Sequence, residues 1–346
     1  MTDSIKTTTH DAASAPAKTT SRRKLLQAAG MAGLAVGSLA LPTLVRAQNN
    51  PKIRVGYWPI AAGLPFYAAI ELGYFKEAGL NVEPVKSASA QQIVEGMLSD
   101  RADGSANGTS SANLAEGELA APGSFKIFCS NPSNVKNVLD EVIVPIGSSV
   151  KTIADLKGKR VCAAPGIQNV TLAKTVMERG GATGVTVIEL PIGQHVAALV
   201  AGQIAAAYTL EPTGTIGRLN GTTRVIEAGV IAKYVLGDPM APWFGGSASL
   251  TTTFIKANPE VAKKYIAAYA KGVAYVRSEP VEARQYLKGY TAIEGPLASE
   301  VPLAAYMMYN EFTPKDIAYF QKFFDLFAEK GIFTSRMVVD TMMYKG

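Results

Sequence analysis

The feature that most constrains the fold is an alternation of short β-type runs with helix-type stretches, which occurs twice along the chain. In the first series, strands are predicted at residues 53–57, 81–85, 102–106 and 125–129, and helices at 65–78 and 90–100. In the second series, strands are predicted at residues 160–164, 185–190 and 205–208, and helices at 170–179 and 196–202. Alternation of this kind indicates a parallel sheet flanked by helices.

The two series follow the same order, which predicts an α/β fold of two similar doubly wound lobes. Each runs from a glycine-led strand, at Gly79 or Gly184, through an amphipathic helix into a strand of small residues. Extended segments at residues 142–145 and 247–254 are expected to cross between the lobes as a hinge. Lobe I then comprises residues 48–143 with 247–346, and lobe II residues 144–246. After Pro259, apolar residues at helical spacing predict a helical tail packed on lobe I.

Residues 1–47 have the layout of a cleavable export signal. A basic, polar start to Lys24 is followed by an apolar stretch, and cleavage is predicted after Ala47. The run from Ser21 to Leu26 resembles a twin-arginine signal, with Leu25 where Phe is common; an ordinary secretory signal is the alternative. Because glycines and a proline interrupt the apolar stretch, a permanent membrane anchor is a poor interpretation. We expect a soluble, periplasmic protein without a stable membrane anchor.

The basic net charge of the chain is concentrated in this leader. The whole chain carries a formal charge of +6, but six basic and two acidic residues lie within positions 1–47. The remaining chain is therefore only slightly basic. A protein that binds nucleic acid through a basic surface is not expected, and nucleic acid is not an expected partner.

An enzymatic function finds little support. After the leader the chain has one histidine, His195, so a multi-histidine metal site is excluded and a Ser/His/Asp triad would depend on that residue. Neither a Gly-x-Ser-x-Gly motif nor a Walker-type phosphate loop occurs. Cys129 and Cys162 fall in predicted strands of different lobes, so buried free thiols are favoured over a disulfide. We expect no catalytic residue, no metal and no cofactor.

The candidate ligand residues lie in turns that follow predicted strands. In open α/β sheets, ligands bind beyond the carboxyl ends of the strands, where helix N–H groups converge. Three turns combine glycine with hydroxyl, amide or aromatic residues: Trp58 and Pro59; Asn107, Gly108, Thr109 and Ser110; and Gly166, Gln168 and Asn169. Glu211 either faces the cleft or caps the next helix. Trp58 and Trp243 either form walls of the pocket or pack in the core.

Several stretches together resemble one family of proteins. They are residues 56–59, 73–82, 155–161 and 198–203, with Glu211 and Pro212. They are similar to the binding proteins of nitrate, taurine and aliphatic-sulfonate ABC importers, the NMT1/THI5-like family, which also includes pyrimidine-precursor binders. One departure is that Ile167 and Gln168 follow Gly166, where many relatives have Ser or Thr.

This resemblance implies a type II periplasmic binding protein fold that closes on a small-molecule ligand without catalysis. The ligand would pass to a membrane permease driven by a separate ATPase, and we expect a monomer. A small organic anion of the sulfonate, nitrate or aromatic carboxylate type is the expected ligand, because helix N-termini favour anions and tryptophans favour rings. No Arg falls in the three turns, so N–H and hydroxyl groups would bind the anion.

Three alternatives are open. A relative that binds a pyrimidine or thiamine precursor would share the fold and the transport role. A pyrimidine-synthesising enzyme of the same fold would need a dense cysteine motif, which two separated cysteines do not supply. An exported cofactor enzyme is a further competitor, because the twin-arginine route often carries cofactor-loaded proteins.

Overall fold

The computed structural model describes residues 51–346. The predicted export signal and its cleavage site lie outside these residues. Within the described part, none of the helices combines the length and apolar character needed to cross a membrane.

The first sheet has six strands in the order β11-β4-β10-β3-β1-β2. Strand β1 is parallel to β2 and β3, whereas β10 runs antiparallel to β3 and β4, and β11 antiparallel to β4. Its bounds are β1 (Lys52–Tyr57), β2 (Asn81–Lys86), β3 (Gly104–Ser110), β4 (Phe125–Ser130), β10 (Gly246–Thr251) and β11 (Met307–Met308).

The second sheet has five strands in the order β7-β6-β8-β5-β9. Strand β6 is parallel to β7 and β8, and β5 is antiparallel to β8 and β9. Its bounds are β5 (Asp140–Pro145), β6 (Arg160–Ala163), β7 (Thr186–Glu189), β8 (Ala206–Leu210) and β9 (Thr223–Ala228).

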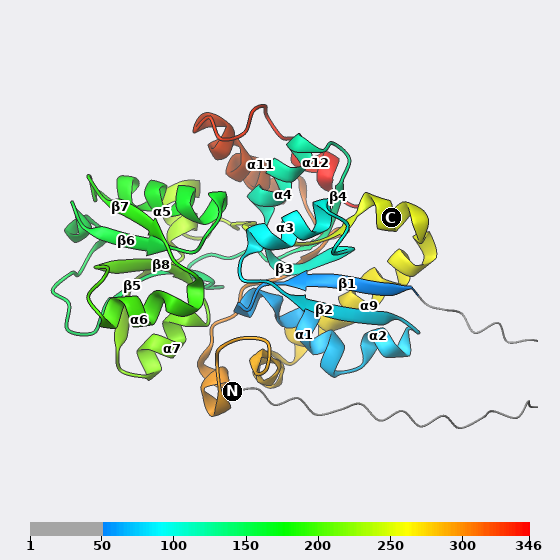
Figure 1. Ribbon diagram of the computed structural model, residues 1–346, viewed down its shortest axis with the longest axis horizontal. Coiled ribbons are helices and arrows are strands. Elements are labelled where there is room, and N and C mark those ends of the chain that lie inside the picture. Colours follow the sequence, from blue (N-terminus) through cyan, green and yellow to red (C-terminus); the bar gives the residue numbers. More distant parts are fainter. Residues whose placement is uncertain (1–50) are drawn as a thin grey trace, which may run out of the picture. The chain divides into compact units, whose positions relative to one another are not determined.

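Helices accompany each sheet, and a sheet with its helices is called a lobe here (Figure 1). The first lobe has α1 (Leu64–Glu71), α2 (Tyr74–Glu77), α3 (Ala90–Leu98), α4 (Ser111–Ala120), α8 (Thr252–Ala257), α9 (Pro259–Ser278), α10 (Pro280–Ala283), α11 (Pro314–Glu329) and α12 (Val339–Met342). The second lobe has α5 (Ile167–Arg179), α6 (His195–Val200) and α7 (Thr213–Leu219). Short 3-10 or π turns are η1 (Ala61–Gly63), η2 (Ile153–Leu156), η3 (Ile192–Gln194), η4 (Ala232–Leu236), η5 (Arg284–Leu287) and η6 (Gly295–Glu300). The predicted fold class is confirmed.

Two predicted elements have different bounds in the structure. The helix expected at residues 65–78 is broken, because Gly73 adopts a left-handed conformation (φ 76°) between α1 and α2. The strand expected to end at Ala106 continues as β3 through Ser110, and all of its residues are buried. Residues Asn107 to Ser110 were therefore wrongly placed in a turn.

The expected crossings at residues 142–145 and 247–254 are also wrong. The first segment lies in β5 and most of the second in β10. Each of these strands lies between two other strands of its sheet and is buried almost throughout. Ser133 and Trp243, which lie between the sheets in sequence, instead pair through two backbone hydrogen bonds, with N···O distances of 2.9 and 3.1 Å. The chain thus passes from one sheet to the other next to this pair.

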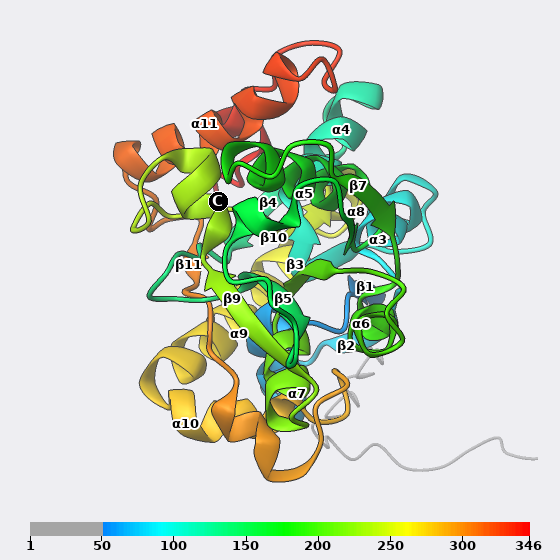
Figure 2. The same ribbon diagram turned by 90° about the vertical axis from the view of Figure 1, so that its left-hand side faces the viewer.

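The C-terminal helices pack mainly on the first lobe, as expected. Helix α9 packs on α1, and its Tyr265 and Tyr269 are fully buried. Helix α11 lies beside α4 (Figure 2). It also contacts η4, which follows β9 of the second lobe. There the Lys322 ammonium donates to the carbonyl of Leu236 at 2.6 Å. The tail therefore contacts both lobes.

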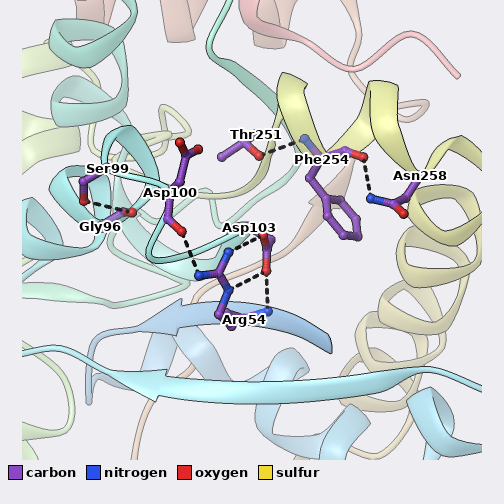
Figure 3. A network of polar contacts seen from close by, with 8 residues as sticks. All are labelled: Arg54, Gly96, Ser99, Asp100, Asp103, Thr251, Phe254 and Asn258. Atoms are coloured by element: carbon purple, nitrogen blue, oxygen red, sulfur yellow. Dashed lines mark hydrogen bonds and ion pairs between the residues drawn. The ribbon is translucent and has the colours of Figure 1, made fainter. Parts of the chain in front are cut away.

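An ion pair joins β1 to the segment that precedes β3 (Figure 3). The Arg54 guanidinium donates to both carboxylate oxygens of Asp103, at 3.0 and 2.8 Å, and to the carbonyl of Asp100 at 2.7 Å. The hydrogen bond to Asp103 raises the pKa of Arg54. Asp103 directly precedes β3, so this ion pair joins β1 and β3 at the end of the sheet that lies opposite the candidate turns.

Candidate ligand site

The turns that follow the parallel strands meet at the junction of the two lobes. The backbone N–H of Ala61, after β1, donates to the carbonyl of Glu211, after β8, at 2.8 Å. Gly166, which precedes α5, lies beside α4: a methyl group on Gly166 would lie 3.5 Å from Nδ2 of Asn113. Residues of both lobes therefore meet at a shared junction.

Gln168 makes the most extensive contacts across this junction. Its Oε1 accepts from the Ser110 hydroxyl at 2.9 Å and from the backbone N–H of Ala112 at 3.0 Å. Its Nε2 donates to the carbonyl of Gly245 at 2.8 Å. The neighbouring Asn169 instead donates to Pro165 within the second lobe. Of the third turn, Gln168 is the side chain that joins the lobes by hydrogen bonds.

Both tryptophans are buried near this junction, with 2% of Trp58 and 1% of Trp243 exposed. Among the described residues, neither indole Nε1 has a hydrogen-bond acceptor, and neither does Nδ2 of Asn131. A methyl group on Gly245 would lie 2.7 Å from Nε1 of Trp243, and one on Gly246 would lie 2.8 Å from Nδ2 of Asn131. Two of these donors therefore flank the same short segment.

The turn that begins with Trp58 contacts this region through Ile60. Half-buried Pro59 separates Trp58 from Ile60, and a methyl group on Gly108 would lie 2.8 Å from Cδ1 of Ile60. Gly108 in turn contacts Gly246, where an added methyl would lie 2.9 Å from the Gly108 Cα. Trp58 and Trp243 belong to one continuous cluster of buried residues, which agrees with the core-packing alternative, and their role as walls of a ligand pocket stays a prediction.

Asn107 faces the interior of the first lobe. Its backbone N–H donates to Tyr269 Oη at 3.1 Å, and Tyr269 Oη donates to its Oδ1 at 2.8 Å. Its Nδ2 donates to Asn131 at 3.3 Å, and Thr109 donates to the carbonyl of Ala106 at 2.9 Å. Of the four candidates in this segment, Ser110 is the one whose side chain bonds across the junction.

Asn131 is a site candidate that the sequence analysis missed. Its Oδ1 accepts from the backbone N–H of Gly108 at 2.9 Å, which leaves Nδ2 free of any acceptor in the part of the chain that the structure describes. The signal was the one used for the other turns, since a polar residue directly follows the buried strand β4.

Replacing Tyr269 by phenylalanine is expected to lower the free energy of unfolding by about 2 kcal/mol, because the N–H and Oδ1 of Asn107 lose their partner while buried. Tyr265→Phe is the matched control: this ring is also fully buried in α9, but its hydroxyl has no partner among residues 51–346. Urea unfolding should show almost no loss for Tyr265→Phe. Equal losses in both variants would contradict a positioning role for the Tyr269 hydroxyl.

His195 has no catalytic geometry. Its Nδ1 is 3.0 Å from the Thr209 hydroxyl and its Nε2 is 3.0 Å from the Leu190 carbonyl, so both ring nitrogens are engaged within the second lobe. Burial lowers the pKa of His195 to about 4, which keeps the ring neutral. Cys129 and Cys162 are buried free thiols, as favoured by the sequence. Residues 51–346 contain no group of three or more His, Cys, Asp or Glu placed to hold a metal ion.

A cavity of about 390 Å³ lies along α3 and β2. It is lined by Lys86, Gln92 and Arg101 among others, and by none of the candidate ligand residues. The junction residues are instead packed against one another.

A comparison with known protein families identifies the family of this chain. The sequence profile described as NMT1/THI5 like matches residues 62–283, more than half of the chain. The chain belongs to the NMT1/THI5-like family. No curated protein matches it in sequence.

Three solved structures have a fold similar to that of this chain. The alkanesulfonate-binding protein SsuA from Xanthomonas axonopodis pv. citri, bound to MOPS, is 18% identical with a TM-score of 0.70, over 86% of this chain and 99% of that one. The periplasmic aliphatic sulphonate binding protein SsuA from Escherichia coli is 17% identical with a TM-score of 0.65, over 85% and 92%. A ligand binding component of an ABC-type import system from Staphylococcus aureus, with zinc bound, is 14% identical with a TM-score of 0.68, over 85% and 97%.

In this NMT1/THI5-like chain, a pair of buried carboxyl groups lies next to the junction. Burial raises the pKa of Glu211 to about 7, against hydrogen bonds from the N–H and hydroxyl of Thr215. Burial also raises the pKa of Glu141, and repulsion from Glu211 and Asp140 adds to it, with Arg218 acting in the opposite sense. The Glu211 side chain thus caps α7, and its backbone carbonyl forms a hydrogen bond between the lobes.

Glu211→Gln is expected to change how stability depends on pH. A carboxyl whose folded pKa is raised stabilises the fold below its unfolded pKa of 4.5, and this contribution is lost as the pH rises towards 7. The uncharged glutamine does not lose it, so the variant should gain stability relative to the wild type over that range. Urea unfolding at several pH values gives the difference between the two proteins, in which the contribution of His195 cancels. Relief of Glu141 from repulsion by Glu211 adds to the gain of the variant. A difference that stays constant from pH 4.5 to 7 would contradict this.

Proposed function

We propose that this chain is the exported solute-binding protein of an ABC importer. In this proposal it captures a small organic anion, foremost a sulfonate, between its lobes and delivers it unchanged to a membrane permease. Family membership and the similarity of fold to two SsuA proteins support this function. The leader is proposed to direct twin-arginine export to the periplasm with cleavage after Ala47, so sequencing of the exported protein should begin at Gln48.

The observation that carries the ligand class is the set of three buried N–H donors without acceptors, on Trp58, Trp243 and Asn131. A buried donor that lacks a partner costs free energy, and buried polar groups in proteins are nearly always hydrogen-bonded. A sulfonate carries three acceptor oxygens and a negative charge, so it would satisfy such donors with charge-assisted hydrogen bonds. The indole rings would contact the organic part of the ligand.

Closure of the lobes would couple binding to transport. A ligand that contacts both lobes binds the closed form more tightly than the open form, so it shifts the population towards closure. The permease would then recognise the orientation of the two lobes.

The test is a ligand panel on the purified mature protein. Methanesulfonate, taurine, MOPS, nitrate, benzoate and a pyrimidine are offered separately, with thermal unfolding and calorimetry as readouts. We expect at least one sulfonate to raise the melting temperature and to be recovered unchanged, because a ligand that binds only the folded state stabilises it. No response to any anion would contradict the ligand class, and tightest binding of the pyrimidine would favour the pyrimidine-precursor alternative. Chemical turnover of any of these compounds would contradict the transport role.

A further inference from the structure

The Gln168 side chain occupies the amino end of helix α4, although it belongs to the other lobe. Gln168 is the second residue of α5, with 4% of its surface exposed. Its Oε1 accepts from Ala112, the second residue of α4, and from Ser110, the residue that caps α4. Its Nε2 holds the carbonyl of Gly245, which also accepts from the backbone N–H of Ser111.

These contacts use the donor and acceptor capacity of one carboxamide on two separate segments, the start of α4 and the residue Gly245. The first-turn N–H groups of a helix have no partner within the helix, and they carry the positive end of its dipole. The Ser110 hydroxyl has a single hydrogen, for which Gln168 Oε1 competes with Oδ1 of Asn113 at 2.5 Å. A neutral amide oxygen is a weaker partner than an anionic oxygen for such donors. An anion at this place would displace it.

We propose that Gln168 is an intramolecular latch that closes the two lobes in the absence of ligand. The latch fills the amino end of α4 with the oxygen of a neutral side chain. A second part of the proposal rests on the function proposed above. The acceptor group of an anionic ligand competes with Gln168 Oε1 for the hydroxyl of Ser110 and the N–H of Ala112. Only a ligand whose acceptor binds these donors more strongly than Gln168 does can then open the latch.

The latch is tested first without any ligand. Small-angle X-ray scattering of Gln168→Ala should give a larger radius of gyration than the wild type, because the three contacts between lobes are lost. Gln168→Asn keeps the amide but shortens its reach, and should behave in the same way. The matched control is Gln321→Ala, which removes a glutamine that also bonds three groups, Asp325, Met337 and Val339, all within the first lobe. It should leave the radius unchanged.

An unchanged radius in both Gln168 variants would overturn the latch, and so would an equal increase in Gln321→Ala. Thermal unfolding of each variant verifies that the protein is folded. Because no ligand is present, these outcomes do not depend on whether the protein binds sulfonates.

The competition is tested with MOPS as the probe. Gln168→Ala should bind MOPS about ten-fold more tightly than the wild type, because the competing closed state is removed. Weaker binding would show that Gln168 is a ligand contact and would overturn the competition. If neither the wild type nor the variant binds MOPS or another sulfonate of the panel, the proposed ligand class fails and the competition with it, whereas the scattering result still decides the latch.

Discussion

Alanine in place of Gly272 is expected to destabilise the protein by about 3 kcal/mol. Gly272 lies in α9 where this helix crosses α1, and a methyl group there would lie 2.3 Å from the backbone carbonyl oxygen of Pro65 and 2.9 Å from Cβ of Ala69. Because a backbone oxygen cannot move aside as a flexible side chain can, α9 would have to shift away from α1. Urea unfolding monitored by circular dichroism measures the loss.

Gly96→Ala is the matched control for this substitution. Gly96 also lies within a helix, α3, but the nearest atom to an added methyl is Cβ of Ala102 at 3.9 Å. This variant should gain about 0.5–1 kcal/mol, because alanine loses less conformational entropy in a helix than glycine. A similar loss in both variants would show that the contact with Pro65 is not the cause.

If the protein binds a sulfonate as proposed, the double variant Trp58→Phe and Trp243→Phe is expected to bind it at least a hundred-fold more weakly than the wild type. Each substitution keeps an aromatic ring in the core but removes an indole N–H that has no acceptor in the described part of the protein. A hydrogen bond to a charged group contributes roughly 1.5–3 kcal/mol, which corresponds to about ten-fold or more for each donor. Calorimetry with the tightest sulfonate of the panel measures the change.

The loss of affinity could come from the missing indole N–H groups or from damage to the fold, and measurements of stability distinguish these two causes. Since the removed donors are unsatisfied without ligand, the unliganded double variant should lose less stability than the ligand-bound one. Tyr265→Phe, which removes a buried hydroxyl remote from the junction, should leave the affinity unchanged. Full affinity in the double variant would show that neither indole N–H binds the ligand.

Much of the fold could be predicted because several of its strands, such as β1, β4 and β5, contain short apolar runs separated by clear turn signals. The helix break at Gly73 was missed because residues 65–78 keep helical spacing on both sides of it. The extension of β3 through Ser110 was missed for a different reason. Asn107 and its neighbours have the composition of a turn, and they become a buried strand because Tyr269 and Asn131, distant in sequence, supply their hydrogen-bond partners.

The positions of the candidate site residues could be predicted in part, and their binding of a ligand stays a prediction. The rule that ligands bind at the carboxyl ends of parallel strands selected Ser110 and Gln168, which the structure joins directly. The same rule could not tell which side chain of a turn faces the junction, because this depends on where the strand ends. Asn107, expected there, faces α9, and Asn131, at the end of β4, was overlooked.

The two cysteines give this protein a built-in reporter of local unfolding. Cys129 lies in β4 of the first lobe and Cys162 in β6 of the second, and burial raises the pKa of each thiol to about 12. A thiol reagent can attack them only when the surrounding strands open. Two distinct labelling rates would mean that the halves of the molecule melt independently, and a single shared rate would mean that they melt as one cooperative unit.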